Sequence, residues 1–145
     1  GMKPMIPLAA LLMGLVLSAN TCTEKTGSAG APAGPSGAKW VLASLNGEAV
    51  RMPEGVETPF LSIDSLGTNV TGYAGCNRVF GTMRIWGDSI AFPGLAATRM
   101  YCQETQQTED RFLEALNLAR TWSVKDGDLI LLGGKELAVF HRSEK

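Results

Sequence analysis

The chain has 145 residues and a nearly balanced charge, with 13 Lys and Arg against 14 Asp and Glu. This length allows one small domain in addition to an N-terminal segment. The sequence has no basic stripe of the kind that binds nucleic acid. It also has no acidic block of the kind that forms a charged tail. The sequence contains no P-loop, no GxSxG or HExxH motif and no dinucleotide fingerprint. We therefore expect a protein that is not an enzyme, holds no cofactor and binds no nucleic acid.

Residues 1–22 have the pattern of an export signal. Lys3 supplies a positive start, and an almost unbroken apolar run extends from Ile6 to Leu17. A bilayer core needs about 20 apolar residues, so this run is too short to span it. A short apolar run after a positive residue favours a secretory signal, with a buried N-terminal helix as the alternative.

Cys22 follows the apolar run in the segment LSANTC, residues 17–22. A cysteine at this place resembles a bacterial lipobox, in which lipid is attached to the thiol and the chain is cut just before it. The match is imperfect, because Ala19, Asn20 and Thr21 stand where an aliphatic residue and small residues are usual. The alternative is cleavage near Ala19, which would release a soluble exported protein. We expect lipid attachment at Cys22, and an anchored protein of the periplasm or outer membrane.

Residues 23–38, TEKTGSAGAPAGPSGA, are rich in Gly, Ala, Ser and Pro. Such a composition buries too little apolar surface to offset chain entropy, so we expect a flexible tether. The folded domain is then predicted to occupy residues 39–145.

The two remaining cysteines, Cys76 and Cys102, form an even pair. Paired thiols of an exported domain tend to oxidise to a disulfide, which the sequence therefore predicts here. A bridge closing about 26 residues would stabilise the domain by roughly 3 kcal/mol. The alternative is two free, buried thiols. No metal site is expected, because the chain has no C-x-x-C pair and His141 is its only histidine.

Short apolar runs separated by turn signals predict strands over most of the domain. Turn dipeptides at residues 46–47, 87–88, 126–127 and 133–134 predict hairpins. The predicted strands are Trp40–Leu45, Thr58–Ile63, Asn69–Tyr73, Thr82–Trp86, Ser89–Phe92, Ala97–Cys102, Trp122–Val124, Leu129–Leu132 and Leu137–His141.

The pattern changes to a helical period between Thr105 and Ala119. Phe112, Leu116 and Ala119 fall on one helical stripe. Acidic residues near the start and Arg120 at the end suit the helix dipole. We expect this helix to cover one side of the sheet. The fold class is therefore mainly β (α+β), a small antiparallel barrel-like sheet with one packed α-helix.

Two motifs give the chain a family resemblance. Residues 72–81, GYAGCNRVFG, resemble the G-x-x-G-C-N-x-x-x-G signature of the META/HslJ-like domain, and residues 98–102, TRMYC, are similar to its T-x-M-x-C element. Tyr101 departs from the small residue that is more usual there. The motif positions are Gly72, Gly75, Cys76, Asn77, Gly81, Thr98, Met100 and Cys102.

The resemblance implies an antiparallel barrel-like fold in a bacterial envelope lipoprotein, linked loosely to heat shock, motility or secretion. It brings no established catalytic residues. The glycines and Asn77 suit a bulged, sharply turned crossing within the sheet. A structural role is one interpretation of the motif. The other makes Asn77, Arg78 and Arg99 a polar recognition surface.

Three functions remain open at this point. The first is a lipid-anchored, stress-related binding or quality-control module that contacts another envelope protein, for which we expect a monomer. The second is an inhibitor of an envelope-directed hydrolase such as lysozyme, with a protruding loop at Met52–Thr58 or Val124–Leu129. The third is a carrier of a small apolar ligand, which requires an open barrel with a cavity.

Overall fold

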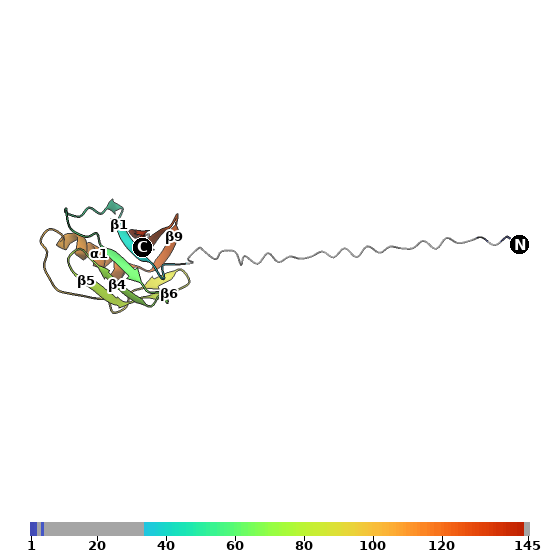
Figure 1. Ribbon diagram of the computed structural model, residues 1–145, viewed down its shortest axis with the longest axis horizontal. Helices are drawn as coiled ribbons and strands as arrows, with labels where there is room; N and C mark the ends of the chain where they lie inside the picture. Colours follow the sequence, from blue (N-terminus) through green and yellow to red (C-terminus); the bar gives the residue numbers. More distant parts are fainter. Residues whose placement is uncertain (3, 5–33, 144–145) are drawn as a thin grey trace. The chain divides into compact units, whose positions relative to one another are not determined.

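The computed structural model describes residues 1, 2, 4 and 34–143 (Figure 1). The predicted signal segment, Cys22 and most of the predicted tether lie outside these residues. Residues 34–143 lie in one compact unit. Its strands are β1 (Lys39–Leu45), β2 (Glu48–Ala49), β3 (Phe60–Ile63), β4 (Asn69–Tyr73), β5 (Arg78–Thr82), β6 (Arg84–Trp86), β7 (Ser89–Ala91), β8 (Ala96–Ala97), β9 (Thr121–Lys125), β10 (Asp128–Leu132) and β11 (Glu136–Arg142), and its helix is α1 (Gln106–Leu118).

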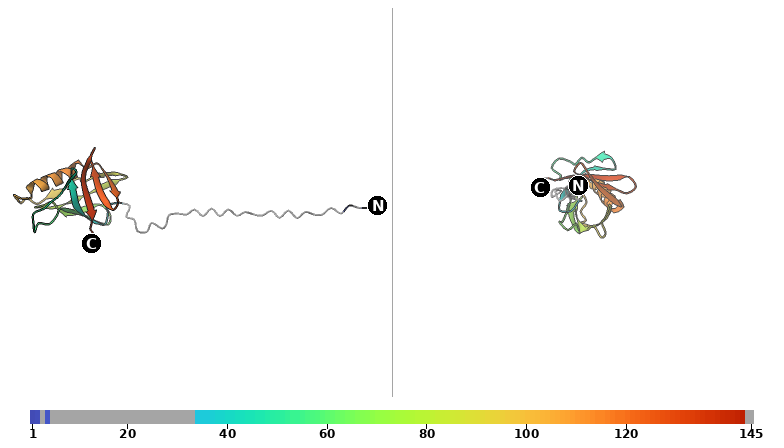
Figure 2. Two further views of the ribbon diagram at one scale, coloured as in Figure 1. Left: turned by 90° about the horizontal axis from the view of Figure 1, so that it is seen from above. Right: turned by 90° about the vertical axis from the view of Figure 1, so that its right-hand side faces the viewer.

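All strand pairs in the described residues are antiparallel. The strands follow one another in the sheet in the order β6-β7-β9-β10-β11-β1-β3-β4-β5-β8, and β2 pairs with β1 beside this path. Only Met83 separates β5 from β6 in the chain, although these strands lie near opposite ends of the order. The Met83 N–H also donates to the Thr68 carbonyl oxygen at 2.7 Å. The sheet must therefore curl back on itself, as the end-on view of Figure 2 shows. The mainly β, barrel-like fold with one packed helix is confirmed.

The hairpin turns follow from local backbone chemistry. Asn46 and Gly47, which join β1 to β2, have φ angles of 50° and 82°. Asp126 and Gly127, which join β9 to β10, have φ angles of 52° and 83°. Positive φ at both central positions is the geometry that Asn-Gly and Asp-Gly pairs accept most readily. The predicted hairpins at these two turns are confirmed.

The predicted helical stripe packs into the core. Phe112, Leu116 and Ala119 are each at most 1% exposed, and the Phe112 ring meets the Phe140 ring edge-on with centroids 6.0 Å apart. Arg120 Nη1 donates to the carbonyl oxygens of Asn117 and Ala119 at 3.1 and 3.0 Å. These bonds satisfy carbonyl oxygens at the C-terminal end of the helix, where the helix dipole favours a basic residue.

Two predictions for the motif region are wrong. Residues 72–81 form no bulged crossing. They belong to a hairpin of β4 and β5 that pairs without a register shift from Asn69↔Thr82 to Tyr73↔Arg78. The predicted strand Ala97–Cys102 stops after Ala97. Thr98 N–H still donates to the Arg78 carbonyl oxygen of β5, but Met100 bonds through its N–H and its carbonyl oxygen to the Asn77 side chain, so the ladder does not continue.

The predicted tether boundary is also wrong. Gly34–Ala38 belongs to the domain, because Pro35 is fully buried and its carbonyl oxygen accepts a 2.8 Å hydrogen bond from Trp40 Nε1. The Gly37 N–H donates to the Asp64 carbonyl oxygen at 2.9 Å. A Gly/Pro-rich composition therefore does not prevent these residues from packing, since partners in the sheet satisfy their backbone.

Candidate functional site

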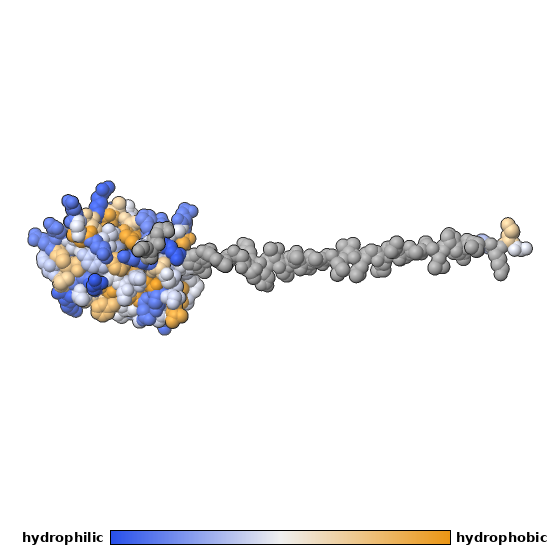
Figure 3. Space-filling model, in the orientation of Figure 1, coloured by the Kyte–Doolittle hydropathy of each residue, from blue (hydrophilic) through white to orange (hydrophobic). Residues whose placement is uncertain are grey.

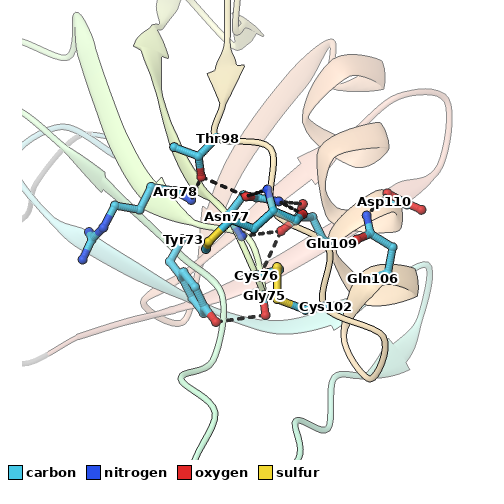
Figure 4. The surroundings of a disulfide bond; sticks show 11 residues. Tyr73, Gly75, Cys76, Asn77, Arg78, Thr98, Cys102, Gln106, Glu109 and Asp110 are labelled. Carbon is cyan, nitrogen blue, oxygen red and sulfur yellow. Dashed lines mark hydrogen bonds between the residues drawn. A yellow bond between two sulfur atoms is a disulfide. The ribbon is translucent and has the colours of Figure 1, made fainter.

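The two motifs meet at the point where the β4–β5 hairpin approaches the start of α1 (Figure 4). Ala74–Asn77 connect the two strands, and the Ala74 N–H donates to the Asn77 carbonyl oxygen at 2.9 Å. Gly75 has a φ of 123°, a conformation that a side chain would strain. This sharp connection turns the backbone N–H groups of Cys76 and Asn77 toward the helix.

Glu109 receives both of those N–H groups. Its Oε2 accepts from Cys76 N at 3.0 Å and from Asn77 N at 2.7 Å, while its Oε1 accepts from Asn77 Nδ2 at 2.6 Å. The side chain is only 3% exposed. All three partners are donors, which suits the acceptor-only carboxylate. Glu109 therefore joins α1 to the motif hairpin.

The Asn77 side chain uses its full hydrogen-bonding capacity. Besides donating to Glu109, Nδ2 donates to the Met100 carbonyl oxygen at 2.9 Å. Oδ1 accepts from Met100 N at 2.6 Å and from Thr98 Oγ1 at 2.9 Å. A primary amide can make two donor and two acceptor bonds, so no position is left free. Asn77 thus links the first motif both to the second motif and to α1.

A disulfide completes the link between the motifs. Cys76 and Cys102 are bonded, with an S–S distance of 1.97 Å and Cα atoms 5.7 Å apart. Thr98 adds a two-way contact with β5, because its Oγ1 accepts from Arg78 N and its N–H donates to the Arg78 carbonyl oxygen, both at 3.1 Å. The predicted pairing of the two cysteines is confirmed.

Two motif glycines are required by close packing. A Cβ on Gly72 would collide with the Phe60 carbonyl oxygen of the neighbouring strand β3. A Cβ on Gly81 would lie 3.0 Å from the Gly94 carbonyl oxygen and from Leu95. Both positions therefore need glycine because another backbone passes directly over them, and neither requires a positive φ.

Tyr73 stands beside the site at the end of β4. Its hydroxyl donates to the Gly75 carbonyl oxygen at 2.9 Å. Burial raises the pKa of this phenol above 10.0, and the carboxylates of Glu57 and Glu109 raise that pKa further. Across the described part of the chain, no three His, Cys, Asp or Glu side chains converge as metal ligands would.

The three candidate recognition residues are placed differently. Asn77 is 3% exposed and fully bonded, so its side chain offers no surface for recognition. Arg78 and Arg99 are exposed. The sequence accounts for the acidic residues at the start of the helix, Glu109 among them, only through the helix dipole and does not predict the bonds of Glu109 to the motif. The one signal that could have indicated them is a carboxylate on the same helical face as Phe112 and Leu116.

The site defines a class of small half-barrel domain in which one asparagine, one buried carboxylate and one disulfide join a hairpin to a helix. The chain belongs to the META domain family, whose family model matches residues 35–144. No match was found among curated proteins.

Two solved structures share the fold. The NMR structure of a protein from Burkholderia xenovorans is 26% identical, with a TM-score of 0.61, and the alignment covers 74% of this chain and 83% of that one. A second NMR structure is 24% identical, with a TM-score of 0.58, and covers 72% of this chain and 87% of the other. The second likeness supports the fold alone.

Proposed function

We propose that this META domain protein is a non-catalytic, stress-related binding module of the bacterial cell envelope, exported and anchored by lipid on Cys22. One observation supports a function without catalysis: the polar side chains of the motif are already bonded to other groups of the protein. Asn77 makes all four of its hydrogen bonds to backbone groups, to Thr98 and to Glu109, and Glu109 binds three donors of the motif, so both side chains are engaged in holding the fold. The signature is therefore a device that holds the fold.

The anchoring part rests on the sequence around Cys22 and on its distance from the domain. Eleven residues lie between Cys22 and Gly34, the first residue of the described domain. A chain of that length extends at most about 40 Å. A lipid on Cys22 would therefore keep the domain close to a membrane surface. Within the described residues, no helix is long and apolar enough to cross a bilayer.

Metabolic labelling tests the anchor. In a bacterial host, we expect the wild-type chain to incorporate labelled palmitate and to fractionate with membranes. Cys22→Ser should abolish the label and release the chain to the soluble fraction. The double variant Cys76→Ser/Cys102→Ser is the control, because it removes the two cysteines of the disulfide but keeps Cys22, and it should leave the label unchanged. A soluble, unlabelled wild-type chain would refute the lipid anchor.

Inhibition of an envelope-directed hydrolase is a second candidate, and one observation favours it. Val124 lies in the β9–β10 hairpin near the tight turn at Asp126 and Gly127, and 39% of its surface is exposed. The other predicted loop, Met52–Thr58, is held at its start, where the Met52 side chain packs beside Gly75, although Glu54 and Gly55 in its middle are exposed. Lysozyme activity on bacterial cell walls, measured with the wild-type chain and with Val124→Asp, tests this candidate. An unchanged rate with excess wild-type chain would exclude lysozyme as the target.

The carrier function has no support in the described residues. The interior of the half-barrel is filled by large side chains that are each at most 1% exposed, among them Trp40, Leu61 and Phe140. Figure 3 shows apolar atoms scattered among polar ones on the face in view, not gathered in one broad patch. On that face, a binding surface is therefore expected to be of limited size.

A further inference from the structure

The sheet ends in a strand whose outer edge is unpaired. β8 is last in the strand order and pairs only with β5. Ala96 lies opposite Phe80, and the Thr98 N–H donates to the Arg78 carbonyl oxygen at 3.1 Å. Bonded residues alternate along an antiparallel ladder. Ala97, which lies between those two positions, therefore directs its N–H and C=O away from β5.

A groove lies along this free edge, and helix α1 forms its other wall. Two adjoining hollows of about 490 and 620 Å³ share Leu95, Ala96, Ala97 and Leu113. Ligand sites commonly measure about 300–1,000 Å³. Leu95, Ala97 and Leu113 are partly buried and pack on the core, which gives the groove an apolar floor.

The charged residues of the groove are few and separated. Glu114 lies on the helix side of one hollow, and Arg99 and the buried Glu109 line the other. Asp110, one helical turn before Glu114, is also exposed. The helix wall therefore favours a ligand that carries positive charge on the side facing α1.

We propose that the groove between β8 and α1 binds an extended polypeptide segment of alternating apolar and basic residues, which adds a strand to β8. The backbone of such a segment would bond to the outward N–H and C=O of Ala97. Its apolar side chains would lie on Leu95 and Leu113, and its basic side chains would face Glu114. Strand addition of this kind takes affinity from main-chain bonds and specificity from alternate side chains.

Edge strands are often kept short to prevent unwanted pairing, and β8 has only two residues. Protection against unwanted pairing explains the short length of β8. It does not explain why an apolar groove lies beside the strand. The inference rests on the proposed binding function. It concerns a different part of the chain from the lipid anchor, so the palmitate assay and the following test can fail independently.

The test uses the chain from Cys22 to Lys145 with Cys22→Ser, which retains the whole compact unit that contains residues 34–143. The probe is an acetylated, amidated peptide of alternating valine and lysine. In ¹H–¹⁵N NMR spectra we expect it to shift the amide signals of Ala97 and Leu113 and to slow hydrogen exchange at Ala97. The control peptide has the same side chains, but alternate backbone nitrogens are methylated. It should bind at least about tenfold more weakly, a difference of about 1.4 kcal/mol.

Matched variants locate the binding. Leu113→Asn removes the apolar floor and should weaken binding about tenfold or more, whereas Leu118→Asn, on the same helix but outside the groove, should not. Ala97→Pro removes the outward N–H without removing a bond to β5, and should also weaken binding. Three results would each overturn the proposal: no shift at Ala97 at millimolar peptide, equal binding of the methylated peptide, or equal binding by Ala97→Pro.

Discussion

Replacing Glu109 by glutamine probes the bond network that joins the helix to the motif hairpin. Glutamine has nearly the same shape, but one of its terminal atoms is a donor. If its oxygen takes the place of Oε2, it still accepts from the N–H groups of Cys76 and Asn77. Its amide nitrogen then faces Asn77 Nδ2, which lies 2.6 Å from Oε1 in the wild-type chain. The opposite orientation places two backbone donors against the amide nitrogen, which is worse.

The expected cost follows from these contacts. One hydrogen bond to a charged group is lost, at about 1.5–3 kcal/mol, and two bonds to a carboxylate become bonds to a neutral oxygen. A neutral side chain is easier to bury than a charged one, and this offsets part of the loss. We expect Glu109→Gln to lower the free energy of unfolding by about 2 kcal/mol.

Urea unfolding of the oxidised protein measures this change. Slopes of about 1–3 kcal/mol per molar urea for small domains convert the loss into a midpoint lower by about 1–2 M. Glu114→Gln is the matched control, because Glu114 lies exposed on the same helix. The control should change stability by less than about 0.5 kcal/mol.

A double-mutant cycle sharpens the test. In an Asn77→Ala background the opposing donor is absent, so Glu109→Gln should cost less there, with a coupling of about 1 kcal/mol. If Glu109→Gln is as stable as Glu114→Gln, or if the cycle shows no coupling, the carboxylate does not hold the motif and the reasoning fails.

Three further changes test the rest of the frame. Reduction of the Cys76–Cys102 disulfide, which spans 26 residues, should lower the free energy of unfolding by about 3–4 kcal/mol. Unfolding of the Cys76→Ser/Cys102→Ser variant should show the same loss, and insensitivity to reductant in the wild type would contradict it. Gly72→Ala should destabilise the domain more than Gly94→Ala, because a Cβ at Gly72 would collide with the Phe60 carbonyl oxygen, whereas a Cβ at Gly94 meets no atom within 4 Å and costs only the strain of a φ of 68°. Equal unfolding midpoints for these two variants would show that β3 can shift to make room for a Cβ at position 72. The pKa of Asp64 lies below its usual 3.8, because the N–H of Thr68, and then the side chain and N–H of Asn69, donate to its carboxylate. The stability that this lowered pKa contributes is present above the unfolded-state value and is lost as the pH falls through the folded-state value. Unfolding midpoints measured below about pH 4 should therefore fall less steeply in Asp64→Asn than in the wild type, and parallel slopes would count against this assignment.

Much of the fold was accessible from the sequence where local chemistry decides it. The turns at Asn46-Gly47 and Asp126-Gly127 need positive φ, which those residues tolerate, so the hairpins could be predicted without any tertiary contact. The helical stripe through Phe112 and Leu116 likewise follows from periodicity alone.

Other elements depend on contacts that no local pattern encodes. Residues 98–102 have the composition of a strand, yet the backbone leaves the ladder after Thr98, because the side chain of Asn77, more than 20 residues earlier, bonds to the N–H and carbonyl oxygen of Met100. The Gly/Pro-rich residues from Gly34 onward resemble a linker, yet Pro35 is buried because the Trp40 side chain bonds to its carbonyl oxygen. The first contact spans more than 20 residues, and in the second segment the Gly37 N–H also donates to the distant Asp64 carbonyl oxygen, so long-range polar contacts override the local preference.

The sequence by itself determined a mainly antiparallel sheet with one amphipathic helix, and it paired Cys76 with Cys102. Those features depend on residue spacing, turn chemistry and the parity of thiols, all of which are local or countable. Only the tertiary structure decided that Glu109 belongs to the motif and that β8 has a free edge beside α1. Both depend on which surfaces meet when the sheet curls, because 32 residues separate Asn77 from Glu109 and only folding brings an acceptor to the donors of the hairpin.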